Sequence, residues 1–355
     1  MAAGTGSEVM PAEAGEAQSG HAVLTMAAMV VVLLLTVIAS LSIGRYTISL
    51  ADLGTLAASW AGIGPGRDGV AEPVWRIVEL VRVPRMLIGA FVGAGLALSG
   101  AVLQGVFRNP LVDPHVIGVS SGAAFGGVLA ILIGAGAVAL WSMAFACGLL
   151  ALLLVVVMSR KAGHSSILML VLSGVVVSAL FSAFVSLATY LADPNDTLPA
   201  IVFWLMGSFA SATPERALYM VPIVTAFAIP LLLMRFRINI LSLGDEEAKA
   251  LGLNVQSTRW LALCCVTGIT AASVANSGIV GWVGLVVPHF ARALVGPDHR
   301  RLLPASALMG ASFMLVVDTM ARSIVPAEIP LGVLTAIVGA PVFMLLLHRT
   351  RSEAW

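Results

Sequence analysis

The chain has 355 residues, of which 59% are apolar and 10% are charged, and its formal net charge is +1. Soluble domains are roughly half apolar, so a core of this size cannot bury so much apolar surface and lipid must cover part of it. The small net charge creates no broad field that would attract nucleic acid. Composition therefore predicts an all-α, polytopic membrane protein that has the lipid bilayer, and no nucleic acid, as a partner.

The N-terminal residues 1–21 are mostly Ala, Gly, Glu and Ser, and they predict a disordered tail. No Lys or Arg precedes the first apolar run, so we expect that run to be a spanning helix and not a cleaved signal peptide. A membrane helix needs about 20 apolar residues. About ten segments meet this requirement within a membrane domain at 22–350, which is followed by a short tail at 351–355. They centre on 22–43, 85–107, 115–133, 137–159, 167–191, 215–234, 257–277, 279–296, 303–325 and 331–348.

Positive charges are distributed unevenly between the loops on the two sides of these spans. With an even number of spans, the loops on one side hold twelve Lys and Arg residues and those on the other side hold seven. Because Lys and Arg concentrate in cytoplasmic loops, this asymmetry predicts a multi-pass protein of the cytoplasmic (inner) membrane with both termini in the cytoplasm. The charged segment 241–254, LSLGDEEAKALGLN, falls on the cytoplasmic side as well.

This charged segment carries the signals of one short helix. Ser242 followed by Asp245 is a capping-box pattern, and consecutive carboxylates favour the first turn of a helix. Asp245 and Lys249 are spaced to form an ion pair one turn apart. Gly252 is expected to end the helix in a left-handed conformation, with Leu253 folding back. The predicted helix has about nine residues and is roughly 14 Å long, so it is either a solvated surface helix or a rigid knob that contacts another protein.

The sequence contains no motif of catalysis. It has no phosphate-binding G-x-x-x-x-G-K-[ST] loop, no Ser-His-Asp set and no H-E-x-x-H, and its His and Cys residues lack the spacing of metal ligands. We therefore expect no enzyme activity, no cofactor and no metal site. Only Asp318 lies clearly within a predicted span, and Arg322 follows it on the same helix face. Because the charges of Asp318 and Arg322 would neutralise each other, the pair is not suited to coupling transport to an ion gradient.

Five segments resemble, in order, one family: the permeases of iron-chelate and vitamin B12 ABC importers. The similar segments are RVPRMLIGAFVGAGLALSGAVLQGVFRNPLVDPHVIGVSSGAAFG (82–126), LPAIVFWLMGSF (198–209), LSLGDEEAKALGLN (241–254), GLVVPHFARALVGPDHRRLLPASALMGA (284–311) and EIPLGVLTAIVGAPVFMLLL (328–347). The resemblance covers about 22–350. It implies a type II import permease of ten helices, in which two copies of the chain form a central pathway. A dimer of ABC ATPase subunits would bind inside, and a soluble extracytoplasmic binding protein would deliver the substrate outside.

The resemblance implies import of an iron complex, either ferric siderophore or haem, with cobalamin as the alternative cargo. A hypothesis from a different class is an ion-coupled secondary transporter. Almost no ionisable residues lie within the predicted spans, which argues against an ion-coupled transporter. A non-transporting scaffold would not explain the face of serines described below.

The resemblance also implies roles for particular residues at the two ends of the protein. The segment 241–254 is similar to the family's cytoplasmic coupling helix, which contacts the ATPase, and 295–304 is a second candidate contact. Near the outer end, Arg82, Arg85 and Arg322 match positions that receive acidic side chains of the binding protein, whereas the alternative is that they snorkel to the headgroups. The residues carried over as the ATPase coupling site are Gly244, Asp245, Glu246, Glu247, Ala248, Leu251 and Gly252.

Small residues recur at every fourth position on the predicted span 167–191. Gly174, Ser178, Ser182 and Ser186 form one narrow face of this helix. The family places the helix at the axis between two copies, so the resemblance implies that this face lines the translocation path. The alternative is close helix packing, which is our interpretation of a similar stripe on the second span: Gly89, Gly93, Ala97 and Ala101.

Residues 198–208 are expected to form a short helix at the outer mouth of the path. Phe203 and Trp204 on this helix would shape the entrance or belong to an interfacial aromatic belt.

Overall fold

The computed structural model describes the backbone of residues 12–63, 66–161 and 167–350. Within these residues every regular element is helical, which confirms the all-α prediction. Each predicted span overlaps a helix, although the first helix begins at Ala12 and so includes residues 12–21 of the predicted disordered tail. These helices are α1 (Ala12–Ser42), α4 (Val83–Phe107), α5 (Val119–Leu132), α6 (Ala137–Lys161), α7 (Ile167–Leu191), α9 (Pro214–Leu233), α12 (Val255–Ser277), α13 (Val283–Val295), α14 (His299–Ser323) and α15 (Leu331–Thr350).

Shorter elements connect these helices. The sequence predicted two of them, α8 (Thr197–Met206) and α11 (Asp245–Ala250). The others are α2 (Leu50–Trp60), η1 (Gly66–Gly69), α3 (Glu72–Arg76), the π-helical η2 (Ile77–Arg82), η3 (Pro114–Ile117) and α10 (Arg235–Leu243).

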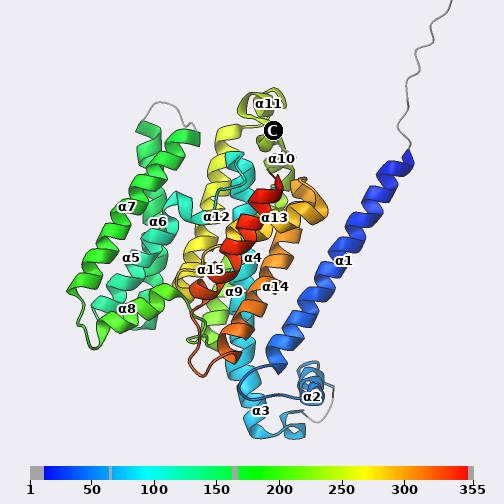
Figure 1. Cartoon of the computed structure of the whole chain (residues 1–355), viewed down its shortest axis with the longest axis vertical. Helices are drawn as coiled ribbons and strands as arrows, with labels where there is room; N and C mark the ends of the chain where they lie inside the picture. The colour runs from blue at the N-terminus through cyan, green and yellow to red at the C-terminus, as the bar shows by residue number, and fades with distance from the viewer. Residues whose placement is uncertain (1–11, 64–65, 162–166, 351–355) are drawn as a thin grey trace, which may run out of the picture.

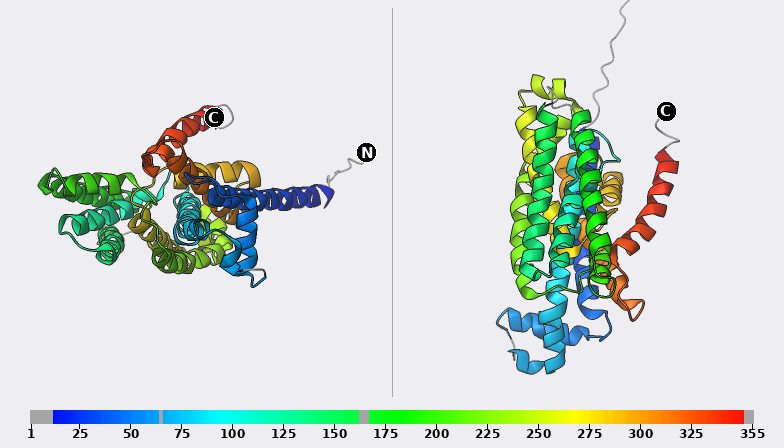
Figure 2. Two further views of the ribbon diagram at one scale, coloured as in Figure 1. Left: turned by 90° about the horizontal axis from the view of Figure 1, so that it is seen from below. Right: turned by 90° about the vertical axis from the view of Figure 1, so that its left-hand side faces the viewer.

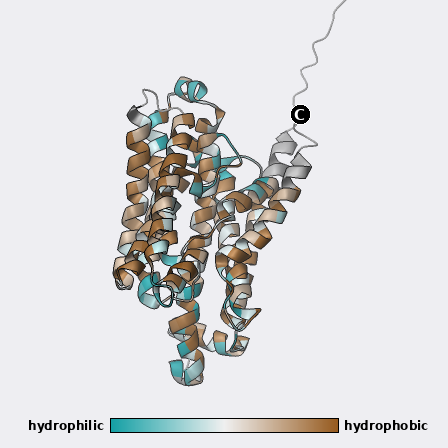
Figure 3. Ribbon diagram, turned by 60° about the vertical axis from the view of Figure 1, so that its left-hand side comes forward, coloured by the Kyte–Doolittle hydropathy of each residue, from teal (hydrophilic) through white to brown (hydrophobic). Residues whose placement is uncertain are grey.

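Seven helices of the described chain are long and apolar enough to cross a membrane. One of them is continuous from α3 through η2 into α4, so it is longer than a membrane span requires. The helices α5 and α13 and the described part of α15 are shorter apolar helices. Apolar residues cover the long helices, and hydrophilic ones gather at the ends of the bundle and on α11 (Figure 3). This distribution is that of a polytopic membrane protein.

The bundle has two distinct ends. Helix α11 lies at one end, together with the first turns of α1 and the last turns of α15 (Figure 1). Helices α2, α3 and α8 lie at the opposite end. We call these the α11 end and the α8 end. Two flanks are also distinct, because α7 lies at one edge of the bundle and α1 at the other (Figures 1 and 2).

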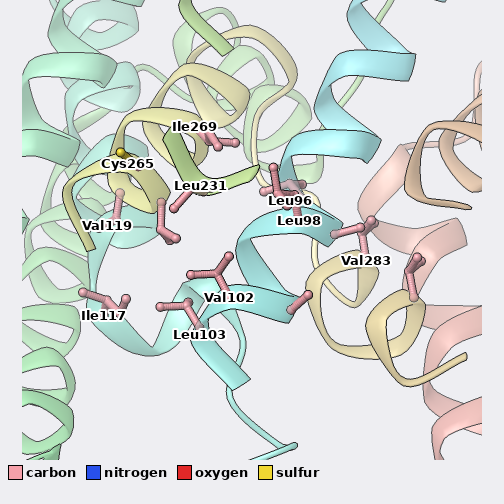
Figure 4. Close-up of a cluster of buried hydrophobic side chains, with 14 of the residues drawn as sticks. Leu96, Leu98, Val102, Leu103, Ile117, Val119, Leu231, Cys265, Ile269 and Val283 are labelled. Carbon is pink, nitrogen blue, oxygen red and sulfur yellow. The ribbon is translucent and has the colours of Figure 1, made fainter. Parts of the chain in front are cut away.

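The core is built around α4 and α12, which are buried along most of their length. Apolar side chains from several helices converge there, among them Leu98 and Val102 of α4, Leu231 of α9 and Ile269 of α12 (Figure 4). Helices at the edge of the bundle, such as α7, bury much less of their surface. Close contact between helices therefore determines which helix lies at the centre, and α4, which is rich in small residues, occupies that position.

Glycines set how closely the central helices approach. A Cβ placed on Gly93 of α4 would lie 2.1 Å from the carbonyl oxygen of Gly310 on α14, and one placed on Gly100 would lie 1.8 Å from the oxygen of Gly284 on α13. A Cβ on Gly310 would in turn lie 2.6 Å from the Cβ of Ala97. The stripe of small residues on α4 is thus a packing surface, as predicted.

Candidate coupling surface and translocation path

Helix α11 is a six-residue helix, shorter than the predicted nine, and its C-terminal end has the predicted form. Gly252 adopts a left-handed conformation with φ of +80°. The Gly252 N–H donates to the carbonyl of Lys249, and the Leu253 N–H donates to the carbonyl of Ala248, both at 2.9 Å. These two bonds form a Schellman motif, which satisfies carbonyls that a helix end leaves unpaired. The chain therefore leaves α11 at a fixed angle.

The N-terminal end of α11 differs from the prediction. Ser242 does not cap it, because this residue belongs to α10 and its hydroxyl donates to the carbonyl of Asn239 at 2.7 Å. The residue before α11 is Gly244, with φ of +147° and no side-chain cap. A Cβ there would lie 2.0 Å from a carboxylate oxygen of Glu247. Gly244 thus permits a sharp reversal from α10 into α11 that other residues would strain.

The charges of α11 pair differently from the expectation. Lys249 bonds Glu246 at 2.8 Å and not Asp245, and the hydrogen bond from its ammonium group to Glu246 raises the pKa of Lys249. Asp245 instead accepts hydrogen bonds from Arg259 of α12 at 2.8 and 3.0 Å. Arg108, which ends α4, lies 3.7 Å from the same carboxylate. Because the Arg259 side chain is 2% exposed, Asp245 fixes α11 to the core helices.

The outer surface of α11 is available to a partner. Glu246 and Glu247 are exposed, whereas Ala248 is fully buried beneath the helix. Two leucines flank the carboxylates: Leu243 is 62% exposed and Leu251 is 61% exposed. Acidic groups between exposed apolar side chains, on a helix held from below, form a surface suited to a protein contact. All seven predicted coupling residues lie on or beside this surface, which we call the α11 knob.

A second segment lies next to the α11 knob, and sequence reasoning missed the residue that connects them. Asn239 of α10 accepts hydrogen bonds from the N–H of His299 at 2.7 Å and donates to Asp298, the residue that caps α14. Burial alone would raise the pKa of Asp298, but hydrogen bonds from Arg300 N–H and Asn239, with the nearby Arg300 and Arg301 charges, lower it. The predicted contact 295–304 and the α11 knob therefore share one support.

The structure brings the three predicted docking arginines together near the α8 end and buries them. Arg85 donates from Nε to Asp318 at 2.9 and 3.1 Å, and its two Nη atoms bond Glu328 at 2.8 and 3.0 Å. Asp318, expected to pair with Arg322, thus has Arg85 as its nearer partner, and Arg322 Nε lies 3.5 Å away. With Arg82, these side chains form a group of three positive and two negative charges. We call this group the outer ion network: Arg82, Arg85, Asp318, Arg322 and Glu328.

The other two arginines bind the chain that follows α1. Arg82 donates to the carbonyls of Leu41 and Tyr46, and Arg322 donates to the carbonyl of Ser40. All three arginines are less than 10% exposed. They are not snorkelling side chains, because their charged groups point into the protein. A docking carboxylate would reach them only after a rearrangement.

The face of small residues on α7 divides into two parts. A Cβ placed on Gly174 would lie 2.4 Å from the carbonyl oxygen of Val116, so Gly174 is a packing contact with η3. Ser178 is partly buried beside Gly118, whereas Ser182 and Ser186 are exposed. Both exposed serines belong to α7, and this helix lies at one edge of the bundle (Figures 1 and 2).

Helix α8 lies at the α8 end, where a short outer helix was expected (Figure 1). Trp204 packs inward, because a Cβ on Gly127 of α5 would lie 2.1 Å from its ring. Phe203 is 47% exposed. A cavity of about 480 Å³ lies between α8, the segment before α13 and α15, and its lining includes Met206, Trp282 and Ile337.

Comparison with known proteins shows the family to which this chain belongs. Residues 32–349 match the model of the FecCD transport family. The molybdate import system permease protein MolB of Haemophilus influenzae is 47% identical, over 90% of this chain and 94% of that protein. An iron chelatin transport system permease protein of Helicobacter pylori is 43% identical, over 78% of this chain and 83% of its own length. Other relatives are permeases named for cobalamin and for hemin.

A solved structure agrees with the fold as well as with the sequence. A metal-chelate type ABC transporter in an inward-facing conformation superposes with a TM-score of 0.83 and 44% identity, and the match covers 91% of this chain and 98% of that one. The chain belongs to the FecCD transport family and is an ABC importer permease.

Proposed function

We propose that this chain is the pathway-forming subunit of an importer that moves an iron complex, a ferric siderophore or haem, across the cytoplasmic membrane. The observation that carries the proposal is the α11 knob. It is a short acidic helix fixed to α12 by the Asp245–Arg259 pair, and its exposed side projects from one end of the bundle. Because the sequence has no nucleotide-binding motif, the energy comes from a dimer of ABC ATPase subunits that bind there.

The proposal also includes a second copy of the chain and a soluble binding protein. A second copy of the chain faces α7, so that Ser182 and Ser186 from both copies form part of the path wall. Their hydroxyls offer few fixed binding groups, which suits passage of a bulky complex without tight retention. The soluble binding protein docks at the α8 end and contacts the outer ion network. With this orientation, both ends of the chain lie on the cytoplasmic side with α11.

The names of the relatives support two classes of cargo. The iron chelatin relative supports an iron complex, whereas the 47% identical relative is named for molybdate, which makes that oxyanion a second candidate. The two exposed serines on α7 carry no charge that would select between them. Uptake assays with ferric siderophore, haem, cobalamin and molybdate, each with its cognate binding protein, separate the candidates.

Coupling is tested by substitutions on the α11 knob. Glu246→Arg reverses an exposed charge, and Gly252→Pro cannot adopt φ of +80° or donate the N–H that closes the helix. In proteoliposomes with the ATPase and the binding protein, each variant is expected to reduce uptake at least about tenfold while ATP hydrolysis continues.

Two matched variants control this test. Glu72→Arg changes an exposed carboxylate at the α8 end, and Gly252→Asn keeps a residue that tolerates the left-handed conformation. Both should retain most of the uptake. Wild-type uptake by Glu246→Arg and Gly252→Pro together would remove the coupling assignment.

A further inference from the structure

The guanidinium of Arg85 is already occupied by carboxylates from within the chain. Its Nε atom bonds Asp318, and its Nη atoms bond both oxygens of Glu328 in a bidentate fork at 2.8 and 3.0 Å. Arg85 is 8% exposed. An external carboxylate therefore cannot simply be added to Arg85, because each of the three guanidinium nitrogens has an acidic partner.

The two internal carboxylates differ in how easily they could leave. Asp318 is 1% exposed, lies within α14 and is also close to Arg322. Glu328 is 25% exposed and lies in the irregular segment between α14 and α15. Removing either one alone would leave a buried arginine without compensation, which is strongly unfavourable. If a carboxylate from another protein took the place of Glu328 on Arg85, the charge balance and the hydrogen bonds would be kept.

The position of Glu328 connects this fork to the outer mouth. Three residues after it, the Leu331 N–H donates to the carbonyl of Gly207 at the end of α8, at 2.9 Å. Leu331 begins α15, whose first turns line the cavity of about 480 Å³ with α8. A displacement of Glu328 would therefore move the start of α15 and strain its hydrogen bond to the end of α8.

We propose that Glu328 is an internal substitute for an acidic side chain of the binding protein. On docking, an incoming Asp or Glu replaces Glu328 on Arg85, and the segment 324–330 moves away and loosens the contact between α8 and α15. This inference rests on the proposed function. It makes Glu328 a positioning residue that competes with the partner and keeps the outer end closed until the partner arrives.

The exchange is tested with the permease–ATPase complex in nanodiscs and the cargo-loaded binding protein. Glu328→Gln keeps the shape of the side chain but removes its charge, so its hold on Arg85 weakens. The variant is expected to bind the binding protein about tenfold more tightly than wild type. Glu72→Gln, which alters an exposed ion pair at the same end, should bind like wild type. Unchanged or weaker binding by Glu328→Gln would overturn the exchange.

A second measurement does not depend on that variant. Spin labels on Ala327→Cys and on Ala51→Cys of α2, both exposed positions, report the position of the segment in protein that lacks Cys147, Cys264 and Cys265 and keeps Glu328. Docking is expected to lengthen and broaden the distance between the labels, and an unchanged distance in the docked complex contradicts the proposal. If the wild-type complex binds no binding protein at all, the importer assignment itself fails, which is a separate outcome.

Discussion

Gly93 and Gly310 determine how close α4 and α14 can lie. Each glycine faces the other helix at a distance that leaves no room for a Cβ, and Ala97 fills the next turn. In lipid there is no hydrophobic force that drives helices together, so such close contact supplies much of the packing energy. The network of arginines at the α8 end depends on the same contact, because Arg85 belongs to α4 and Asp318 to α14.

Substitution at Gly93 should therefore be severe. In Gly93→Val, the side chain would clash with the backbone of Gly310, and we expect a loss of at least about 3 kcal/mol and a fall of about 5 °C or more in the apparent unfolding midpoint. The matched control is Gly54→Ala on α2, where no atom lies within 4 Å of the added Cβ. That change should be neutral or stabilising by up to about 1 kcal/mol. Equal midpoints for the two variants would contradict this role of Gly93.

Some residue-level features could be predicted because they depend on neighbours in the sequence. The end of α11 is an example, since Gly252 and Leu253 close the helix through bonds within five residues. The partner of Asp318 was not predictable in this way. Arg322 has the spacing of an ion pair, but Arg85, 233 residues away, makes the shorter contact. Sequence spacing cannot show that α4 and α14 bring these two side chains together.

At the scale of elements, α10, α11 and the start of α14 behave as one support. Asn239 connects α10 to Asp298 and His299, and Asp245 connects α11 to Arg259 of α12. The sequence analysis predicted no helix between the span 215–234 and the charged segment 241–254, so α10 was missed. With α10 unrecognised, Ser242 looked like a helix cap, although it lies inside a helix. The error at Ser242 and the missed Asn239 thus have the same origin.

This support should transmit movement of the α11 knob to the membrane helices. Asn239→Leu keeps a similar side-chain volume but removes the hydrogen bonds to Asp298 and His299. We expect uptake to fall about fivefold or more while the complex still hydrolyses ATP, because α10 no longer moves with α14. The rates of uptake and hydrolysis are measured together in proteoliposomes. If Asn239→Leu reduced both rates in proportion, Asn239 would be needed for folding or assembly and not for transmission.

At the scale of the whole molecule, α7 is a helix at the edge of the bundle, where the proposed second copy would contact it. The family resemblance predicted that this helix faces a second copy, and the serine spacing alone left packing open. The structure adds a physical distinction within the stripe, since Gly174 is packed against η3 whereas Ser182 and Ser186 are exposed. The sequence could not show this difference, because η3 contacts α7 from a distant part of the chain.

Accessibility at these serines should change during the transport cycle. In a background without Cys147, Cys264 and Cys265, Ser182→Cys and Ser186→Cys are each labelled with a polar maleimide. We expect the labelling rate to change severalfold between the nucleotide-bound and nucleotide-free complexes. Val31→Cys on α1, at the opposite flank and 54% exposed, lies within an apolar span and should stay unlabelled in both states. State-independent labelling at both serine positions would assign them to static packing.

The central claim is that this chain forms the path while another protein supplies the energy through the α11 knob. The most direct measurement compares vesicles that contain the chain with its binding protein, with and without the ABC ATPase dimer. We predict accumulation of cargo against its gradient only when the ATPase and ATP are both present. Accumulation by the chain alone, driven by an imposed ion gradient, would contradict the account.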